Sequence, residues 1–348
     1  MKILIMAGGS GERFWPLSTK KNPKQLLSIV SNKSMIKETV DRVLKIVKIH
    51  DIFVATNIIQ VPGVKRELPN LPIENIIIEP AFRDTAAAIA YGSTVIARTE
   101  DNPIIVVLAS DHLIVDEDKF VESIILAETE ANKGNIVTLG INPTRPETGY
   151  GYIEITDKYL FKPTKAIKFL EKPSLDLAVE YTLSGKHVWN SGMFIFKYKT
   201  IMKELEIHSH NHFEVIKKIK PHLKKLSGIK LSKAVEGFFP MFEKISIDFA
   251  VMEKSKKIIC IPVEIGWNDV GGYNSLLEIF KSDRYGNIAK DCNYVFVDSN
   301  NNIVLSDNPK KLIASIDISN TIIVDTKNGL LVSKRESTEK IRKILKLL

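Results

Sequence analysis

The chain has 348 residues, and 49 lysines and arginines outnumber 41 aspartates and glutamates to give a formal net charge of +8. The composition is that of a globular protein, and the lack of a long apolar run predicts no membrane span. Cys260 and Cys292 have no partners at metal-ligand spacing, so neither a disulfide framework nor a cysteine metal site is expected. With no leader pattern at the N-terminus, these features favour the cytoplasm.

The excess of basic residues is typical of proteins that bind either nucleic acid or anionic small molecules. The lysine-rich stretch 217–225 has no interleaved aromatic residues and matches no nucleic-acid module. It therefore predicts a solvated helix face rather than a nucleic-acid site. Part of the remaining charge would suit phosphorylated substrates.

The first 140 residues alternate short apolar runs with helical patterns. This alternation predicts an α/β, Rossmann-like fold with a mixed, mostly parallel sheet and helices on both faces. Ligands of such sheets bind beyond the carboxyl ends of the strands. The expected strands are 2–6, 51–56, 75–78, 104–109 and 135–140, and the expected helices are 34–48, 85–99 and 117–133.

The sequence pattern changes after about residue 284. Short β-rich runs separated by Asn, Asp and Gly follow, and then a predicted charged helix over 337–347. We therefore expect a catalytic domain over 1–283 and a small C-terminal β module over 284–348. The remaining expected strands of the first domain are 151–155, 165–170, 191–197 and 258–264, with helices over 174–184, 199–218 and 246–254. The module should contain strands 294–297, 302–305, 312–316, 321–325 and 330–333.

The first predicted strand runs into a glycine-rich loop, AGGSGERFWPL over residues 7–17, and Pro-Lys-Gln follows at 23–25. Glycines let backbone amides approach phosphate oxygens closely, and Arg13 and Lys24 add positive charge. The loop has neither the GK[ST] ending of a P-loop nor a G-x-G-x-x-G fingerprint. An ordinary strand-to-helix turn is the alternative, but the basic residues favour a nucleoside triphosphate site.

This segment resembles the sugar-nucleotide pyrophosphorylases, and among them the GDP-mannose pyrophosphorylases, whose motif reads A-G-G-x-G-x-R-x-W-P-L followed by P-K-Q. The chain departs from it at Glu12, where the family usually has Thr, and at Phe14, where it usually has Leu. The resemblance extends over essentially the whole chain. It implies a GT-A-like nucleotidyltransferase domain and a short left-handed β-helix often used in dimer contact. The loop residues that it places on the nucleotide are Ala7, Gly8, Gly9, Gly11, Arg13 and Lys24.

Ser110 and Asp111 end a predicted buried strand, and Asp269 lies between Trp267 and two glycines. A carboxylate at a strand end suits Mg²⁺, which takes one or two carboxylates and completes its shell with water and phosphate. A helix N-cap is the alternative for Asp111 and a turn residue for Asp269. The resemblance implies that both are metal ligands and that Ser110 and Asp111 border the nucleotide. The family has Pro and Ser where this chain has Ala109 and Asn268.

The tract 79–88, EPAFRDTAAA, predicts the start of a helix with Asp84 or Thr85 as its cap. The resembled family has an equivalent tract, usually with Asn at position 84, against the base and ribose. Asp84 would accept hydrogen bonds from guanine N1–H and N2–H₂ if it points there, or it would only cap the helix. Both interpretations stay open.

Further tracts resemble the sugar-phosphate side of the family. A monosaccharide needs fixed donors and acceptors, which Glu171 and Asn190 supply, and Lys172 could reach the sugar phosphate. Taken singly, Glu-Lys-Pro at 171–173 is also typical of a surface turn, and 246–254 of a simple helix capped by Ser246. The expected sugar-phosphate set is Gly149, Tyr150, Gly151, Glu171, Lys172, Asn190 and Asp248.

The resemblance implies that mannose 1-phosphate attacks the α-phosphorus of GTP in line, giving GDP-mannose and diphosphate. Arg13 would neutralise the β,γ-phosphates, Lys24 would hold the α-phosphate or the incoming phosphate, and Mg²⁺ on Asp111 and Asp269 would bridge the reacting oxygens. Uridylyl, thymidylyl or cytidylyl transfer is the near alternative; a non-catalytic binding paralogue and a nucleic-acid binder are the distant ones. We expect a cytoplasmic, Mg²⁺-dependent homodimer that binds neither nucleic acid nor membrane.

Overall fold

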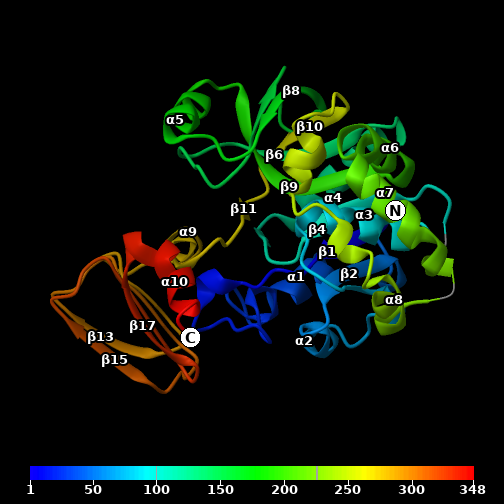
Figure 1. Ribbon diagram of the computed structural model, residues 1–348. Helices are drawn as coiled ribbons and strands as arrows, with labels where there is room; N and C mark the ends of the chain where they lie inside the picture. Colours follow the sequence, from blue (N-terminus) through cyan, green and yellow to red (C-terminus); the bar gives the residue numbers. More distant parts are fainter. Residues whose placement is uncertain (99, 225) are drawn as a thin grey trace. The chain divides into compact units, whose positions relative to one another are not determined.

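The computed structural model describes residues 1–98, 100–224 and 226–348 (Figure 1). Residue 99, at the end of the expected helix 85–99, and residue 225, in the expected lysine-rich face, lie outside the described residues. The chain forms two compact units. Unit 1 comprises 1–8, 39–110 and 114–267, and unit 2 comprises 9–38, 111–113 and 268–348.

Unit 1 is built on a nine-stranded mixed sheet. Its strands are β1 (Lys2–Met6), β2 (Ile52–Asn57), β3 (Ile76–Glu79), β4 (Ile104–Ala109), β6 (Ile136–Ile141), β7 (Tyr152–Ile155), β8 (Thr164–Leu170), β9 (His187–Lys197) and β10 (Ile258–Val263). They lie in the order β3-β2-β1-β4-β9-β6-β10-β8-β7. The expected parallel pairing holds for β3-β2-β1-β4 and for β6 with β10, whereas β9, β7 and β8 pair antiparallel. The mixed α/β fold is therefore confirmed, with the parallel strands concentrated in its first part.

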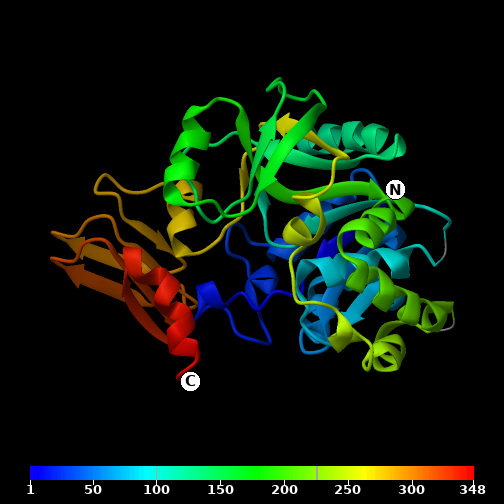
Figure 2. The ribbon, with the colours of Figure 1, turned by 45° about the horizontal axis from the view of Figure 1, so that its top comes forward.

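Helices cover both faces of this sheet, as Figure 2 shows for α4 on one side of β9 and α6 and α7 on the other. The two-sided cover explains why β1, β2 and β4 are almost continuously apolar and buried. The helices of unit 1 are α2 (Val61–Glu67), α3 (Asp84–Ile96), α4 (Glu117–Asn132), α5 (Leu175–Leu183), α6 (Tyr198–His208), α7 (His210–Ile219) and α8 (Gly228–Val235), and α1 (Met35–Val43) spans the 38/39 division.

Three expected elements of unit 1 differ in the structure. The helix expected over 199–218 is two helices, because Ser209 leaves the helical region with φ −147° and ψ 62°. The helix expected over 246–254 is a π-helix, Asp248–Met252, although Ser246 Oγ accepts from Phe249 N at 3.4 Å as a cap would. Strand β9 begins at His187 rather than at 191 because its first residues pair with β7.

Unit 2 contains short strands in two small sheets, and the strand pairs are parallel except for the last pair of the first sheet, which is antiparallel. The first has the order β12 (Ile288–Lys290), β14 (Ile303–Ser306), β16 (Thr321–Thr326) and β17 (Gly329–Lys334), and the second pairs β13 (Asn293–Val297) with β15 (Leu312–Ile316). Ile288, Ile303 and Ile322 occupy matching positions on β12, β14 and β16 and are buried. The stacked parallel strands form the β-helix-like module that the resemblance implied, and they account for the short strands and turns expected from the sequence.

The core of unit 2 also includes the residues that follow the glycine-rich loop. Phe14, Ile29 and Met35 are buried in one cluster with Tyr273 and Ile322. The helix expected over 337–347 is a 3-10 turn, Arg335–Lys340, followed by α10 (Ile341–Leu345), and α9 (Leu276–Ile279) is one turn long. The expected division of the chain into a catalytic domain over 1–283 and a C-terminal module over 284–348 stays a prediction.

Short strands lie where the chain passes from one unit to the other: β5 (Leu113–Ile114) and β11 (Trp267–Asn268) form a two-stranded sheet. In the described part of the chain, no helix has the length and apolar character needed to cross a membrane.

Candidate active site

Lys24 is the centre of a charged cluster in unit 2. It lies in the 3-10 turn η2 (Lys24–Leu26) and is only 6% exposed. Its Nζ atom is 2.9 Å from Asp111 Oδ2 and donates to the backbone oxygen of Asp269 at 2.7 Å. Three segments that are far apart in the sequence therefore meet at one ammonium group, and two of them carry the predicted metal ligands.

Asp111 is held ionised by its surroundings. Burial alone would raise the pKa of this carboxyl group, but the positive charges of Lys24, His112 and Arg13 hold the pKa below its usual value. Its side chain is still 30% exposed. The carboxylate can therefore serve as an acceptor or as a ligand for a cation.

Asp269 is fixed by its own turn. Its Oδ1 atom accepts from the backbone amide of Gly271 at 3.0 Å, and a Cβ atom on Gly271 would lie 2.7 Å from Asp269 Oδ2. Glycine at position 271 thus allows this carboxylate to fold back against the backbone. The turn-residue interpretation describes the local geometry, and the Lys24 contact adds a place in the charged cluster.

The glycine-rich loop is closed by hydrogen bonds within unit 2. Gln25 Nε2 donates to Gly9 O at 3.1 Å, and Ser18 Oγ donates to Gly11 O at 2.6 Å. Gly11 has φ +62°, and a Cβ there would lie 2.5 Å from the backbone nitrogen of Lys24. This position requires glycine because the loop passes so close to the Lys24 turn.

Tyr273 is a supporting residue that sequence reasoning missed. Its hydroxyl donates to Phe14 O at 2.8 Å and to Trp15 O at 3.1 Å, and its ring packs edge-on to Phe14 at 5.0 Å. It anchors the 3-10 turn η1 (Glu12–Phe14), which carries the exposed Arg13. The aromatic residue directly after Gly271-Gly272 was the available signal.

The predicted nucleotide residues of unit 1 follow the ends of strands. Ala7 N donates to Ala55 O at 2.8 Å after β1, and buried Ser110 donates its N–H to Met6 O at 3.2 Å after β4. Gly8 comes next in the chain and lies beside Glu79, since a Cβ on Gly8 would be 3.2 Å from Glu79 Oε1. The expected placement of these residues at the carboxyl edge of the sheet is met.

The expected helix cap at Asp84 or Thr85 is wrong. The residue before α3 is Arg83, and neither side chain makes the cap hydrogen bond. Asp84 has φ +65°, and its Oδ1 atom accepts from the adjacent Thr85 N at 2.8 Å, whereas Thr85 Oγ1 accepts from Ile247 N at 2.8 Å. The Thr85 hydroxyl, which the sequence predicted as a possible cap of the helix, is instead bonded to a residue far along the chain.

A second polar cluster in unit 1 is centred on Asn190. Its Oδ1 atom accepts from Thr138 Oγ1 at 3.2 Å and from Gly192 N at 3.1 Å, and its Nδ2 atom donates to Asp248 Oδ1 at 3.0 Å. Two predicted sugar-phosphate residues, Asn190 and Asp248, are thus in direct contact. Thr138, on β6, was missed because nothing near it in the sequence marks it as functional.

Glu171 extends this cluster. Its backbone N–H donates to Glu253 Oε1 at 2.8 Å, and its carboxylate pairs with Lys172 Nζ at 3.1 Å. A Cβ on Gly151 would lie 2.5 Å from Glu171 Oε2, so glycine makes room for the carboxylate. Burial is the main cause that raises the pKa of Glu171. Burial and the nearby negative charge of Glu171 raise the pKa of Asp248 to about 7.

Tyr150 completes this side of unit 1. Its ring packs edge-on to Trp189 at 5.2 Å and to Trp267 at 5.3 Å. The preceding turn is held by Gly149, whose N–H donates to Glu147 Oε1 at 2.9 Å. Aromatic walls beside polar side chains are typical of monosaccharide sites, in which ring faces cover apolar sugar C–H groups.

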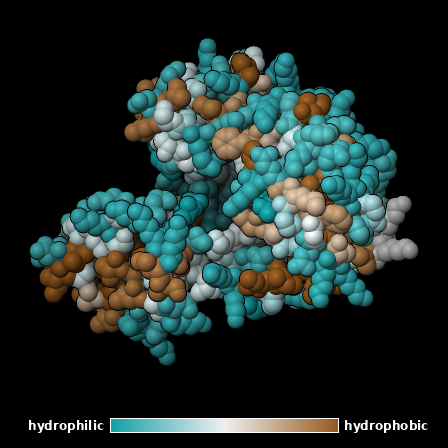
Figure 3. Space-filling model, viewed as in Figure 1, coloured by the Kyte–Doolittle hydropathy of each residue, from teal (hydrophilic) through white to brown (hydrophobic). Residues whose placement is uncertain are grey.

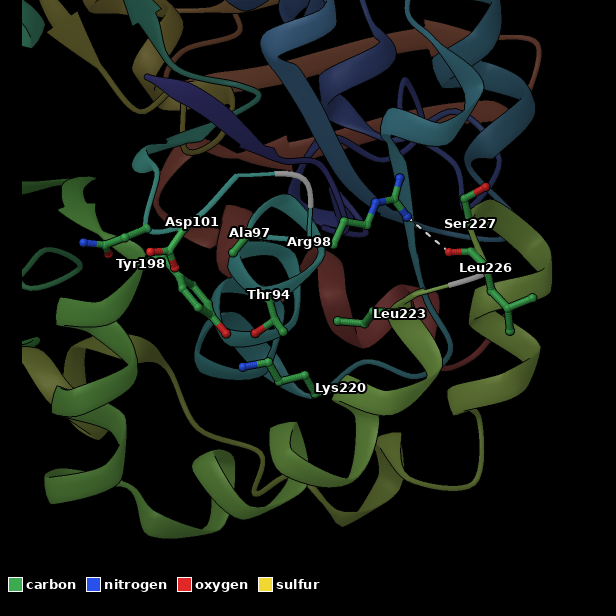
Figure 4. Close-up of a pocket in the computed structure, with 10 residues that line it drawn as sticks. Thr94, Ala97, Arg98, Asp101, Tyr198, Lys220, Leu223, Leu226 and Ser227 are labelled. Atoms are coloured by element: carbon green, nitrogen blue, oxygen red, sulfur yellow. Dashed lines mark hydrogen bonds between the residues drawn. The ribbon is translucent and has the colours of Figure 1, made fainter.

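A cavity of about 540 Å³ lies elsewhere in unit 1 (Figure 4). Arg98, Tyr198 and Lys220 line it, and Arg98 Nη1 donates to Leu226 O at 3.1 Å. Asp101 and Asn102, which also line it, precede β4, whereas the predicted nucleotide residue Ser110 follows the same strand. The cavity therefore lies near the amino end of β4, and the residues described as lining it include none of the predicted site residues.

Comparisons with known proteins identify the family of the chain. The nucleotidyl transferase family matches residues 2–285, and the MannoseP isomerase/GMP-like beta-helix domain matches 292–348. A mannose-1-phosphate guanylyltransferase of Salmonella typhimurium is 36% identical, covering 98% of this chain and 71% of the relative. A mannose-1-phosphate guanylyltransferase of Klebsiella pneumoniae is also 36% identical, covering 99% and 73%.

A solved structure is similar over the full length. The crystal structure named mannose-1-phosphate geranyltransferase from Thermus thermophilus has a TM-score of 0.88 and 29% identity, covering 99% of this chain and 98% of the other. The chain belongs to the nucleotidyl transferase family, and the resemblance stated from its sequence is confirmed. It is a nucleotidyltransferase with a C-terminal β-helix-like domain.

Proposed function

We propose that this chain is a mannose-1-phosphate guanylyltransferase that converts GTP and mannose 1-phosphate to GDP-mannose and diphosphate. The names of relatives at 36% identity over nearly the whole chain support the substrates. The observation that carries the chemistry is the pair of contacts that the buried Lys24 ammonium makes with the Asp111 carboxylate and with the backbone oxygen of Asp269. Such a cluster is suited to placing and neutralising phosphate groups.

The triphosphate would lie along the glycine-rich loop. Backbone groups of Gly9 and Gly11 would face its oxygens, and exposed Arg13 would neutralise the β,γ-phosphates as they leave. Lys24 would hold the α-phosphate or the incoming phosphate while it stays in contact with Asp111. In unit 1 the residues proposed for the nucleotide are Ala7, Gly8, Asp84, Thr85 and Ser110.

The donor set of the cluster fits Mg²⁺. Among the described residues no three His, Cys, Asp or Glu side chains come together as a metal cage. Mg²⁺ needs only one or two carboxylates, because water and substrate phosphate complete its shell, so Asp111 and Asp269 would suffice. Bound there, the ion would supply positive charge to the phosphate oxygens of the reaction.

The chain itself needs only to position the reactants. The phosphate of mannose 1-phosphate is already an anionic nucleophile, so no covalent enzyme intermediate is needed and the sugar C–O bond stays intact. Lys24 and Arg13 reduce the repulsion between two anionic reactants, and the loop fixes the α-phosphorus for in-line attack. The anomeric configuration of the mannose is therefore retained.

The sugar would be recognised by the cluster around Asn190. Asn190, Asp248 and Glu171 offer both donors and acceptors to the hydroxyl groups, and the pKa of Asp248 near 7 allows its carboxyl to act as either. Lys172, paired with Glu171 at 3.1 Å, would contact the phosphate. Gly149, Tyr150 and Gly151 are proposed to form the adjoining wall.

We also propose a homodimer that works in the cytoplasm, where nucleoside triphosphates are made. Apolar side chains gather over the β-helix-like domain in Figure 3, and Leu312 and Ile316 on β15 are 61% and 69% exposed. A contiguous exposed apolar face of this kind supports an interface with a second copy. Light scattering of the purified chain tests it: a monomer mass at micromolar concentration would contradict the dimer.

The proposed activity is tested by measuring diphosphate release in the presence of Mg²⁺. Each of four nucleoside triphosphates is paired with mannose 1-phosphate and with glucose 1-phosphate. Release should be greatest for GTP with mannose 1-phosphate. A maximum for another pair would overturn the substrates while keeping the reaction, and no release with any pair would overturn the enzyme.

A further inference from the structure

The side-chain amide of Asn190 has one fixed orientation. The backbone N–H of Gly192 lies 3.1 Å from one end of this amide, and a backbone N–H can only donate, so that end is the oxygen Oδ1. Thr138 Oγ1 donates to the same oxygen at 3.2 Å. The other end is the nitrogen Nδ2, which donates to Asp248 Oδ1 at 3.0 Å. Rotating the amide by half a turn would place a nitrogen against two donors and an oxygen against a carboxyl group.

The shape of β9 brings Gly192 to this amide. In the register between β9 and β6, Thr138 pairs with Phe194. Gly140 pairs with Asn190, so one residue of β6 faces three residues of β9, and β9 bulges there. Gly192 lies in the bulge with φ +70°, a conformation that favours glycine. Bulges of this kind re-aim backbone groups and side chains next to functional sites.

Thr138 reaches the amide from β6. The residue directly opposite Asn190 is Gly140, which has no side chain. Thr138 lies two positions earlier on the same face of β6 and is the diagonal neighbour that supplies the hydroxyl. Its side chain is buried, with 0% exposed, so it does not itself face a substrate. Any effect of Thr138 on a substrate therefore acts through Asn190.

These bonds leave Asn190 only a donor to offer. An amide oxygen accepts two hydrogen bonds and an amide nitrogen donates two. Thr138 and Gly192 use both acceptor positions, and Asp248 uses one of the two N–H groups. Within the described part of the chain, no group accepts the second Nδ2 hydrogen. That hydrogen matches an oxygen of a ligand.

We propose that Thr138 is a positioning residue for the sugar: its hydroxyl holds the Asn190 amide so that Nδ2–H donates to a hydroxyl oxygen of mannose 1-phosphate. The inference rests on the proposed guanylyltransferase function, and it assigns the direction of one hydrogen bond in the sugar site.

The test compares full-length variants by steady-state kinetics with each substrate varied in turn. Thr138→Val replaces the hydroxyl by a methyl group of similar size, so the KM for mannose 1-phosphate should rise by about 3-fold to 10-fold, as expected for one hydrogen bond. The KM for GTP should stay unchanged. Thr138→Ser keeps the hydroxyl and should restore the KM for mannose 1-phosphate.

Gly192→Ala tests the same orientation from the other donor. A Cβ at this position meets nothing within 4 Å, so the change adds no clash, but φ +70° is strained for alanine. The resulting shift of the bulge should raise the KM for mannose 1-phosphate and leave the KM for GTP unchanged. This variant decides the question if Thr138→Val does not fold.

Monodeoxy analogues of mannose 1-phosphate show whether the lost affinity belongs to this hydrogen bond. The analogue that lacks the hydroxyl facing Asn190 should have a raised KM with the wild type. With Thr138→Val the KM values of that analogue and of mannose 1-phosphate should lie closer together, because the two changes remove the same interaction. Equal penalties for every analogue in both enzymes would contradict the proposal.

Thr94→Val is the matched control. Thr94 is also buried, with 2% exposed, and its Oγ1 atom donates to Ala90 O at 2.7 Å within α3. Losing this hydroxyl should leave both KM values unchanged. Thermal unfolding of all variants measures the structural cost of each change.

The outcomes separate the inference from the proposed function. An active wild type whose Thr138→Val variant is less stable but has unchanged KM values would give Thr138 a purely structural role and overturn the inference alone. An equal rise in both KM values would also overturn it. A wild type that releases no diphosphate with any pair of substrates would overturn the proposed function itself.

Discussion

Two clusters of the molecule shift the pKa values of their carboxyl groups in opposite directions. One surrounds Lys24 in unit 2, and the other surrounds Asn190 in unit 1. Asp111 lies beside cations that lower its pKa, whereas Asp248 and Glu171 lie beside each other and have raised pKa values. The first arrangement keeps a full negative charge, as a cation-dependent phosphate site requires. The second keeps protons available near neutral pH, which suits hydroxyl groups that both donate and accept.

The largest effect should come from breaking the charged cluster. In Asp111→Asn the ion pair with Lys24 is lost, and we expect turnover to fall by about 10²–10³-fold, as for loss of one electrostatic contact to a transition state. Diphosphate release and circular dichroism would measure activity and folding. Asp118→Asn, at a side chain that is 89% exposed, is the control. Near wild-type turnover of Asp111→Asn would refute the assigned role.

The next largest effect should come from replacing Asn190, the uncharged residue at the centre of the cluster in unit 1. Asn190→Ala removes contacts to Thr138, Gly192 and Asp248, so the KM for mannose 1-phosphate should rise about 10-fold or more while the KM for GTP changes little. Steady-state kinetics with each substrate varied in turn would show the difference. Asn135→Ala, at a half-buried position just before β6, should change neither constant. An equal rise in both KM values would remove the distinction between the clusters.

A substitution that adds bulk but no charge should show how much the geometry of the glycine-rich loop contributes to stability. Gly11→Ala places a Cβ 2.5 Å from Lys24 N at a φ of +62°, which should lower the free energy of unfolding by about 1–3 kcal/mol. Gly237→Ala, where a Cβ meets nothing within 4 Å, is the matched control for calorimetry. Equal stability of the two variants would show that the loop shifts freely.

The smallest effect is a change in the pH dependence of stability. Because the folded-state pKa of Asp248 is raised from 3.8 to about 7, its contribution is fully present below about pH 4 and is lost as the pH rises through 7. Asp248→Asn should therefore gain stability relative to the wild type over that window, by about 1 kcal/mol or more. Asp176→Asn, at an exposed site on α5, should follow the wild-type curve. A constant difference across this pH range would contradict the raised pKa.

Local patterns were enough for much of this molecule. The strands 2–6 and 104–109 were predicted from apolar runs, because a strand buried on both faces is apolar at every position. The glycine-rich loop was predicted because the conformational freedom of glycine and the charges of Arg13 and Lys24 are properties of single residues.

The contacts between distant segments could not be predicted in this way. Phe14 packs with Tyr273, and Asn190 joins Thr138 to Asp248, although no local period links these positions. The missing side-chain cap of α3 likewise depends on a distant segment, because Thr85 Oγ1 accepts from Ile247 N.

The sequence by itself determined the family, the order of most elements and the residue types of the candidate site. Only the tertiary structure decided which carboxyl groups have raised pKa values and which have lowered ones. The physical reason is that a pKa depends on burial and on charges within a few ångströms, and both are set by the packing of segments that are remote in the chain. Glu79 ends β3 and Asp111 follows β4, and only their neighbours in space make the first a buried carboxyl group with a raised pKa and the second an ionised partner of Lys24.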